Sequence, residues 1–257
     1  MPDDDFYRLR RSKPSGPGQL RVPGAPRRSC PVFLPAEYQP KYSYPLVLLL
    51  HPSGSDEWET LARVPYLSNR NYIVLCPRGS RPVAPNSYGQ MRWSWTAGHP
   101  TDIGYLQRLL DSACQRWNTP NPRLYVIGVG PAAALAERLA TVYPGVITGL
   151  ALLHPVAEHI QQRILGQVIR PGLRLFLGAE IHPPLSRSVI RRLAAHYRRL
   201  GATVRQESWP FGLPWYLHGL RRINHWIMDT MPAAALPTSR PAILSNALKP
   251  HLTAAEL

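Results

Sequence analysis

Short apolar runs alternate with amphipathic segments through the middle of this 257-residue chain, and this alternation limits the fold more than any other feature. Alternating strands and helices predict a mostly parallel sheet with helices on both faces, an α/β architecture. We expect strands at Pro31–Leu34, Leu46–Leu50, Tyr72–Leu75, Leu124–Ile127, Gly149–Leu153, Leu173–Leu177 and Thr203–Ser208. We expect helices at Asp56–Val64, Thr101–Trp117, Ala132–Val142, Glu158–Leu165, Ser186–Leu200 and Tyr216–Asp229.

The two ends of the chain differ in composition from this middle part. Residues 1–27 combine prolines, clustered acids and arginines without a hydrophobic period, which predicts a disordered basic arm with at most a short strand at Gln19–Val22. Residues 231–257 are rich in proline and alanine and predict a tail. The expected organisation is therefore one domain over residues 28–230 between an arm and a tail.

The chain carries a formal net charge of +15, and all but three of its 30 basic residues are arginine. Such a charge could attract nucleic acid or an anionic membrane face. The arginines are scattered along the chain and lack an interleaved aromatic platform, which favours solvated faces over a nucleic-acid site. An arginine-rich anion-binding module stays open as an alternative function.

Cysteine content and hydropathy indicate the compartment. Cys30, Cys76 and Cys114 show no CxxC or metal-knuckle spacing, so we expect reduced thiols, with Cys76 and Cys114 filling the core. No aliphatic run exceeds Leu46–Leu50, far below the roughly 20 residues of a membrane span. No apolar stretch follows the N-terminal Met-Pro-Asp-Asp-Asp, so we expect no secretory signal and a cytoplasmic protein.

Two strand ends resemble motifs of a known family. Leu50-His51-Pro52-Ser53-Gly54 closes a strand in a His-x-x-Gly turn, and Gly128-Val129-Gly130-Pro131-Ala132 joins a strand to an alanine-rich helix. Both resemble the oxyanion loop and the nucleophile elbow of α/β-hydrolases of the phospholipase/carboxylesterase type. Cys76-Pro77-Arg78-Gly79 and Trp93-Ser94-Trp95 resemble the predicted-esterase branch, and the resemblance covers roughly residues 30–230. It implies the α/β-hydrolase fold.

The elbow of this family reads Gly-x-Ser-x-Gly, and its serine is the nucleophile. Gly130 stands at the serine position and has no side chain with which to form an acyl-enzyme. Pro131 follows, where the family uses a backbone N–H as an oxyanion donor, and proline has none. Ser53 keeps the N–H of the second donor.

The resemblance also places the acid and the base of the catalytic triad. The acid position, in Gly-x-x-Asp, is occupied by Ile181, with Glu180 one residue early. The base position, in Pro-x-Gly-His, is occupied by Leu213 in the turn Pro210-Phe211-Gly212-Leu213, and His218 is the nearest substitute. Nucleophile, acid, base and one oxyanion donor all differ from the family pattern.

Other polar and aromatic residues follow the expected strands. His51, His154 and His182, with Glu180, could form a metal or anion site, but their spacings match no ligand motif, so we expect neither a metal nor a cofactor. Trp93, Trp95, Trp209 and Trp215 could line a cleft, although such residues more often cover the core.

The sequence thus predicts a catalytically inactive esterase homologue that acts by binding an unidentified protein or small molecule. An active serine hydrolase with a relocated site, in which Ser53 is paired with His51 or His154, is the enzymatic alternative.

Overall fold

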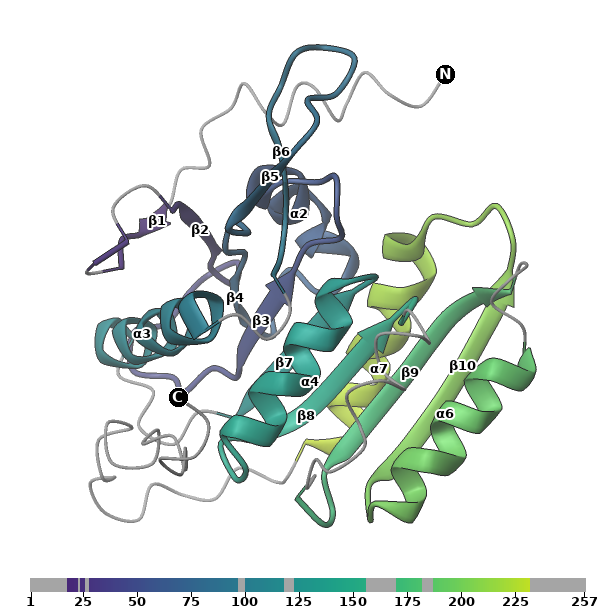
Figure 1. Ribbon diagram of the computed structural model, residues 1–257. Helices are drawn as coiled ribbons and strands as arrows, with labels where there is room; N and C mark the ends of the chain where they lie inside the picture. Colours follow the sequence, from purple (N-terminus) through teal and green to yellow (C-terminus); the bar gives the residue numbers. More distant parts are fainter. Residues whose placement is uncertain are drawn as a thin grey trace.

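The computed structural model describes residues 18–22, 24–25, 28–96, 100–117, 123–155, 170–181 and 187–231. Its centre is an eight-stranded sheet of order β1-β2-β4-β3-β7-β8-β9-β10 (Figure 1). The strands are β1 (Gln19–Leu20), β2 (Cys30–Phe33), β3 (Leu46–Leu50), β4 (Ile73–Leu75), β7 (Leu124–Val129), β8 (Ile147–Leu153), β9 (Arg174–Ile181) and β10 (Thr203–Pro210).

Strands β4, β3, β7, β8, β9 and β10 pair in parallel, and β1 and β2 join antiparallel at one edge. The central strand β3 is the aliphatic run Leu46–Leu50 and is buried along its whole length. A parallel strand covered on both faces needs such a continuous apolar sequence. The expected mostly parallel sheet is confirmed, and it begins within the predicted N-terminal arm, at β1.

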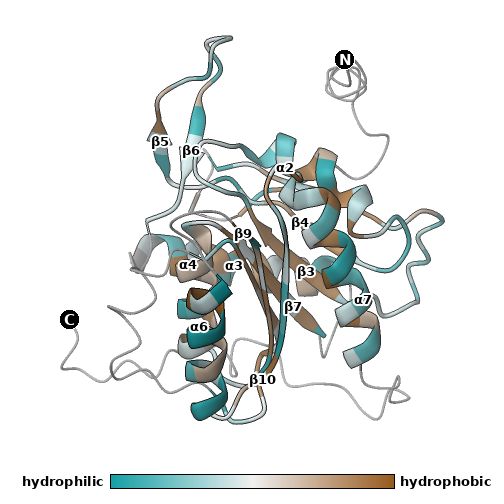
Figure 2. Ribbon diagram, turned by 90° about the vertical axis from the view of Figure 1, so that its right-hand side faces the viewer, coloured by the Kyte–Doolittle hydropathy of each residue, from teal (hydrophilic) through white to brown (hydrophobic). Residues whose placement is uncertain are grey.

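Helices cover both faces of the sheet, as predicted (Figure 2). Strand residues of even number in β3, such as Leu48, pack with α3 (Pro100–Arg116), α4 (Ala132–Val142) and α6 (Arg187–Arg199). Their odd-numbered neighbours, such as Leu49, pack on the other face with α2 (Glu57–Arg63), η1 (Val64–Tyr66), η2 (Tyr216–Leu220) and α7 (Arg221–Thr230). This alternation follows from the period of two in a strand.

Three features differ from the sequence prediction. Residues 81–94, expected as loop, include an antiparallel hairpin of β5 (Arg81–Val83) and β6 (Arg92–Ser94) that rises from one end of the sheet (Figure 1). Strands β9 and β10 run on to Ile181 and Pro210, paired in register to their ends. The last helix begins with the π-helical turn η2. The predicted helix Glu158–Leu165 lies outside the described residues.

Candidate functional site

The turn between β7 and α4 is the one whose sequence resembles a nucleophile elbow. Gly130 adopts a left-handed φ of +59°, and its N–H donates to the carbonyl of Leu153 at the end of β8. A Cβ added at Gly130 would meet no atom within 4 Å, so the tip of the elbow has room for a side chain. Gly128, by contrast, is pressed against α4, where an added Cβ would lie 2.6 Å from the carbonyl oxygen of Ala132. The glycine before the tip is therefore required by packing, and the glycine at the tip is not.

Pro131 lies at the N-cap of α4 in a helical conformation, with φ −59°. This φ is the one that the proline ring imposes, so the residue fits the first turn without strain. The position that should supply an oxyanion donor therefore supplies none. Ser53 lies after β3, the strand next to β7. Its N–H donates to no described residue, so it is the member of the expected pair of oxyanion donors that is kept.

His51 directly follows the neighbouring strand β3 and is fully buried. Its Nε2 accepts a hydrogen bond from the Gly79 N–H at 3.0 Å, and its Nδ1 lies 2.8 Å from the Pro52 carbonyl, to which it donates. The Trp95 indole N–H donates to the His51 carbonyl. Burial lowers the pKa of His51 to about 4, so the ring is neutral at pH 7 with both nitrogens occupied. His51 is a structural residue that joins three loops.

Ser53 lies in the tight turn after His51 and is exposed. Gly54 takes a φ of +78° there and donates its N–H to Trp93, which ties the turn to β6. The Ser53 hydroxyl forms no hydrogen bond within the described part of the chain. Ser53 and His51 are therefore close in sequence, but no described hydrogen bond joins the Ser53 hydroxyl to the His51 ring.

Glu180 and Ile181 are the last two residues of β9, not part of a loop after it. Successive strand residues point to opposite faces, so Glu180 lies on the face of Phe176, and Ile181 on the face of α4 and α6. The Glu180 carboxylate accepts the backbone N–H of Gly212 in the turn after β10. The carboxylate that remains therefore binds the backbone of the turn that should carry the base.

The base position itself is apolar. Leu213 is half-buried and packs against the core on the α7 side of the sheet. His218 lies in η2, half-buried, and its backbone N–H reaches the Pro214 carbonyl at 3.4 Å. A π-helical turn is uncommon and frequently marks functional sites. Here it lies directly after the turn that differs from the family pattern.

His154 follows β8 and has a positive φ of 48°, unusual for a residue with a side chain. Its backbone N–H donates to the Gly178 carbonyl at 2.8 Å, and its ring packs edge-on against Trp209. Trp209 is 3% exposed and fills the space beside Gly178, where an added Cβ would lie 3.1 Å from the indole. The sequence does not distinguish Trp209 from Trp93, Trp95 and Trp215, and its place on the α7 side of β10 follows only from the strand register.

The other tryptophans also serve packing more than a cleft. Trp95 is buried beside His51, and Trp93 lies under the guanidinium of Arg78. Trp215 lies under the guanidinium of Arg63. Within the described ranges no cluster of His, Cys, Asp and Glu could hold a metal ion, and His182 lies outside those ranges. No helix in the described part is long and apolar enough to cross a membrane.

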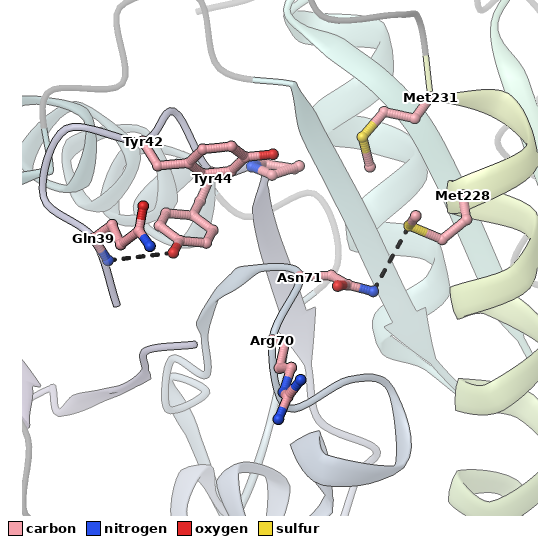
Figure 3. Close-up of a pocket in the computed structure, with 8 residues that line it drawn as sticks. Gln39, Tyr42, Tyr44, Arg70, Asn71, Met228 and Met231 are labelled. Atoms are coloured by element: carbon pink, nitrogen blue, oxygen red, sulfur yellow. Dashed lines mark hydrogen bonds between the residues drawn. The ribbon is translucent and has the colours of Figure 1, made fainter. Parts of the chain in front are cut away.

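A pocket of about 260 Å³ lies at the opposite end of the parallel strands, beside the start of β3 (Figure 3). Tyr42 and Tyr44 form one wall, and Met228 and Met231 lie across from them. Asn71 donates a weak hydrogen bond to the Met228 sulfur at 3.7 Å. This pocket was not predictable from the sequence, because its residues come from three distant segments that only the fold brings together.

The whole arrangement is similar to solved esterases. A carboxylesterase from Bacillus cereus is 20% identical, with a TM-score of 0.59 over 80% of this chain and 95% of that chain. A carboxylesterase from Mesorhizobium loti is 16% identical, with a TM-score of 0.58 over 82% of this chain and 99% of that one. Esterase PE8 is 15% identical, with a TM-score of 0.59 over 78% and 98%. No protein-family profile and no curated protein matches the chain in sequence. The strand order and these similarities show that the chain has the α/β-hydrolase fold.

Proposed function

We propose that this chain is an esterase-like α/β-hydrolase homologue without serine-hydrolase activity, and that it acts by binding a protein or a small molecule. The observation that carries the proposal is the pair Gly130 and Pro131 at the elbow. Gly130 has the backbone of a nucleophile position, with open space around it, but no side chain. Pro131 has no N–H to offer an oxyanion.

The changes at Gly130 and Pro131 together support inactivity more strongly than either change alone. Removing one oxyanion donor typically costs about 2.7–4 kcal/mol of transition-state stabilisation. Without a nucleophile the acyl-enzyme step has no route at all, and loss of any triad member removes most of the catalysis. With Ile181 and Leu213 at the acid and base positions, a single reversion restores nothing.

The relocated-site alternative receives little support from the geometry. His51 is neutral, buried and engaged through both ring nitrogens, so it cannot take a proton from Ser53 without breaking its contact with Gly79 or Pro52. A general base must be within hydrogen-bond reach of the proton that it abstracts. We therefore place the retained function in binding. We also place it in the cytoplasm, in keeping with the buried thiols of Cys30 and Cys76.

The test is an activity assay on the purified full-length protein with short p-nitrophenyl esters, together with labelling by a fluorophosphonate probe. A carboxylesterase of the same fold serves as the positive control for both. We expect ester hydrolysis at the rate of a heat-denatured sample, and no labelled band.

Labelling that a single Ser→Ala change abolishes would contradict the proposal and identify a relocated nucleophile. Ser53→Ala is the first variant to make, because Ser53 is exposed in the turn after the carboxyl end of β3. Ser112→Ala, at a half-buried serine on α3 whose hydroxyl donates to the Arg108 carbonyl, is the control.

A further inference from the structure

Two groups of described arginines contrast in their surroundings. In the first group, Arg28 pairs with Asp102, and Arg92 pairs with Asp56 and Glu59. Further ion pairs join Arg63 to Glu59, Arg78 to Glu57, Arg205 to Glu207 and Asp229, and Arg222 to Glu207. These arginines have their charge balanced within the protein.

Helix α6 carries the second group. Within the described residues, none of its five arginines forms an ion pair, and all five are exposed: Arg187, Arg191, Arg192, Arg198 and Arg199. One of them, Arg198, donates to the Val204 carbonyl, which leaves its charge unbalanced. The helix contains no acid. The nearest carboxylate on a neighbouring helix, Glu137 of α4, is buried and accepts the Tyr197 hydroxyl.

The sheet beneath α6 adds no acid either. Glu207 of β10 shares the face of Trp209 and pairs with Arg205 and Arg222, so it points to the α7 side, away from α6. Figure 1 shows α6 at one end of the sheet, beside β10 and open to the outside. Among the residues that the structure describes, the outer side of α6 is therefore an exposed, strongly positive surface without a paired carboxylate.

Helical geometry arranges the five arginines in two rows. At 100° and 1.5 Å per residue, Arg187, Arg191 and Arg198 lie within about 40° of one another, along about 16 Å of helix. Arg192 and Arg199 form a second row about 110° away. Exposed Ala195 lies between the rows. The helix thus presents a small side chain at its centre and guanidinium groups on both flanks.

We propose that this face of α6 binds the phosphate backbone of duplex DNA without base-sequence preference. The major groove of B-DNA is about 12 Å wide and admits an α-helix. A helix with arginines on both flanks places guanidinium groups toward the phosphates of both strands, and guanidinium is well suited to phosphate.

The composition of the outer face selects this partner over other polyanions. The apolar residues of α6, Ile190, Leu193 and Tyr197, are buried in the core, so the exposed side of the helix has no apolar face to insert into a membrane. It carries no aromatic residue on which a single-stranded base could stack. What remains is electrostatic attraction to a rigid double row of phosphates.

The experiment measures the affinity of the full-length protein for a fluorescent DNA duplex of about 20 base pairs, roughly two helical turns, by anisotropy. With five phosphate contacts, log Kd should depend on log salt with a slope near 4.5, so binding weakens about 500-fold between about 50 and 200 mM salt. Duplexes of different sequence should bind alike. Anionic vesicles of phosphatidylserine and phosphatidylcholine, measured by co-sedimentation, should bind far more weakly.

Two variants of equal charge change test the location. Replacing Arg191, Arg192, Arg198 and Arg199 with Gln should lower the slope to about 1 and weaken binding at least tenfold at about 50 mM salt. The second variant replaces four exposed arginines outside α6 with Gln: Arg21, Arg70, Arg108 and Arg221. Its affinity for DNA should stay within about threefold of the wild type. Circular dichroism checks that both variants are folded.

Three results would overturn the proposal. The first is a wild-type slope below about 1, which needs no variant to interpret. The second is equal loss in both variants, which would mean that net charge alone attracts DNA. The third is binding of the vesicles but not of DNA.

Discussion

The Nε2 atom of His51 accepts a hydrogen bond from the backbone N–H of Gly79 over 3.0 Å. This bond joins the end of β3 to the loop that follows β4, inside the protein, where a charged imidazole is strongly disfavoured. A histidine at the end of a central strand was a candidate catalytic residue by position. Its contacts make it a neutral structural acceptor.

This burial predicts a pH dependence of stability. The pKa of His51 is lowered by burial to about 4, below its ordinary value of 6.5. The unfolded chain therefore binds this proton more readily, so the contribution of His51 is complete above about pH 6.5 and is lost as the pH falls toward 4. At pH 5 the loss amounts to about 2 kcal/mol. His51→Gln keeps an acceptor but cannot titrate, so urea denaturation at pH 7.5 and 5 should show a smaller pH effect in the variant than in the wild type.

His225→Gln is the matched control, because His225 is exposed on α7. Its pH dependence should equal that of the wild type. If the wild type and His51→Gln lose stability in parallel between the two pH values, His51 is not held neutral in the folded protein.

The sheet was predictable because its signals are local. Aliphatic runs such as Leu46–Leu50 identify buried strands, and their alternation with amphipathic helices gives the parallel arrangement. The hairpin β5–β6 was not predictable, since Arg81–Val83 is short, polar and contains proline. It is held by contacts with distant residues, such as the isolated bridge between Ser55 and Trp93.

The sequence predicts where the motif residues lie along the chain, but not which residues they contact. The motif spacing placed Gly130 at the elbow, and the structure gives it the left-handed φ that an elbow needs. The sequence could not show that Glu180 ends β9 and binds the Gly212 N–H, because strand ends depend on pairing with β10. The packing of His154 against Trp209 depends on the same register.

Removing one partner of the buried ion pair between Arg28 and Asp102 should strongly destabilise the fold. Asp102 is fully buried and accepts the Arg28 guanidinium at 2.7 Å, the Ser80 hydroxyl at 2.9 Å and the Thr96 N–H at 2.9 Å. Asp102→Asn leaves the buried guanidinium without its counter-charge, so the free energy of unfolding should fall by about 3–5 kcal/mol.

The control for this charge removal is Asp229→Asn. Asp229 pairs with Arg205 at the surface, with its side chain 64% exposed. Such a pair contributes at most about 1 kcal/mol. Similar losses in the two variants, measured by chemical denaturation, would mean that the Arg28–Asp102 pair is solvated rather than buried.

Gly128 and Gly130 should respond differently to the same substitution. An alanine Cβ at Gly128 would lie 2.6 Å from the Ala132 carbonyl oxygen and 2.8 Å from the Cα of Ala133, so α4 must move. At Gly130 the Cβ meets nothing, and the cost is only the left-handed backbone. We expect Gly128→Ala to lower the free energy of unfolding by about 3 kcal/mol, and Gly130→Ala by about 1 kcal/mol. Equal losses would mean that the strand and helix are not packed this closely.

Restoring a serine at the elbow should give a folded but inactive protein. Gly130→Ser places a hydroxyl in open space, at the cost of about 1 kcal/mol for the left-handed backbone. The serine still has no base, because Leu213 occupies that position, and Pro131 still offers no oxyanion donor. Adding Pro131→Gly returns the missing N–H, and adding Leu213→His supplies a base in the turn that Glu180 holds through Gly212. Esterase activity should therefore be absent from the single variant Gly130→Ser and first appear in the triple variant. A Gly130→Ser protein that hydrolyses p-nitrophenyl acetate above the rate of Gly130→Ala would contradict the assignment of Leu213 and Pro131 to the base and oxyanion positions.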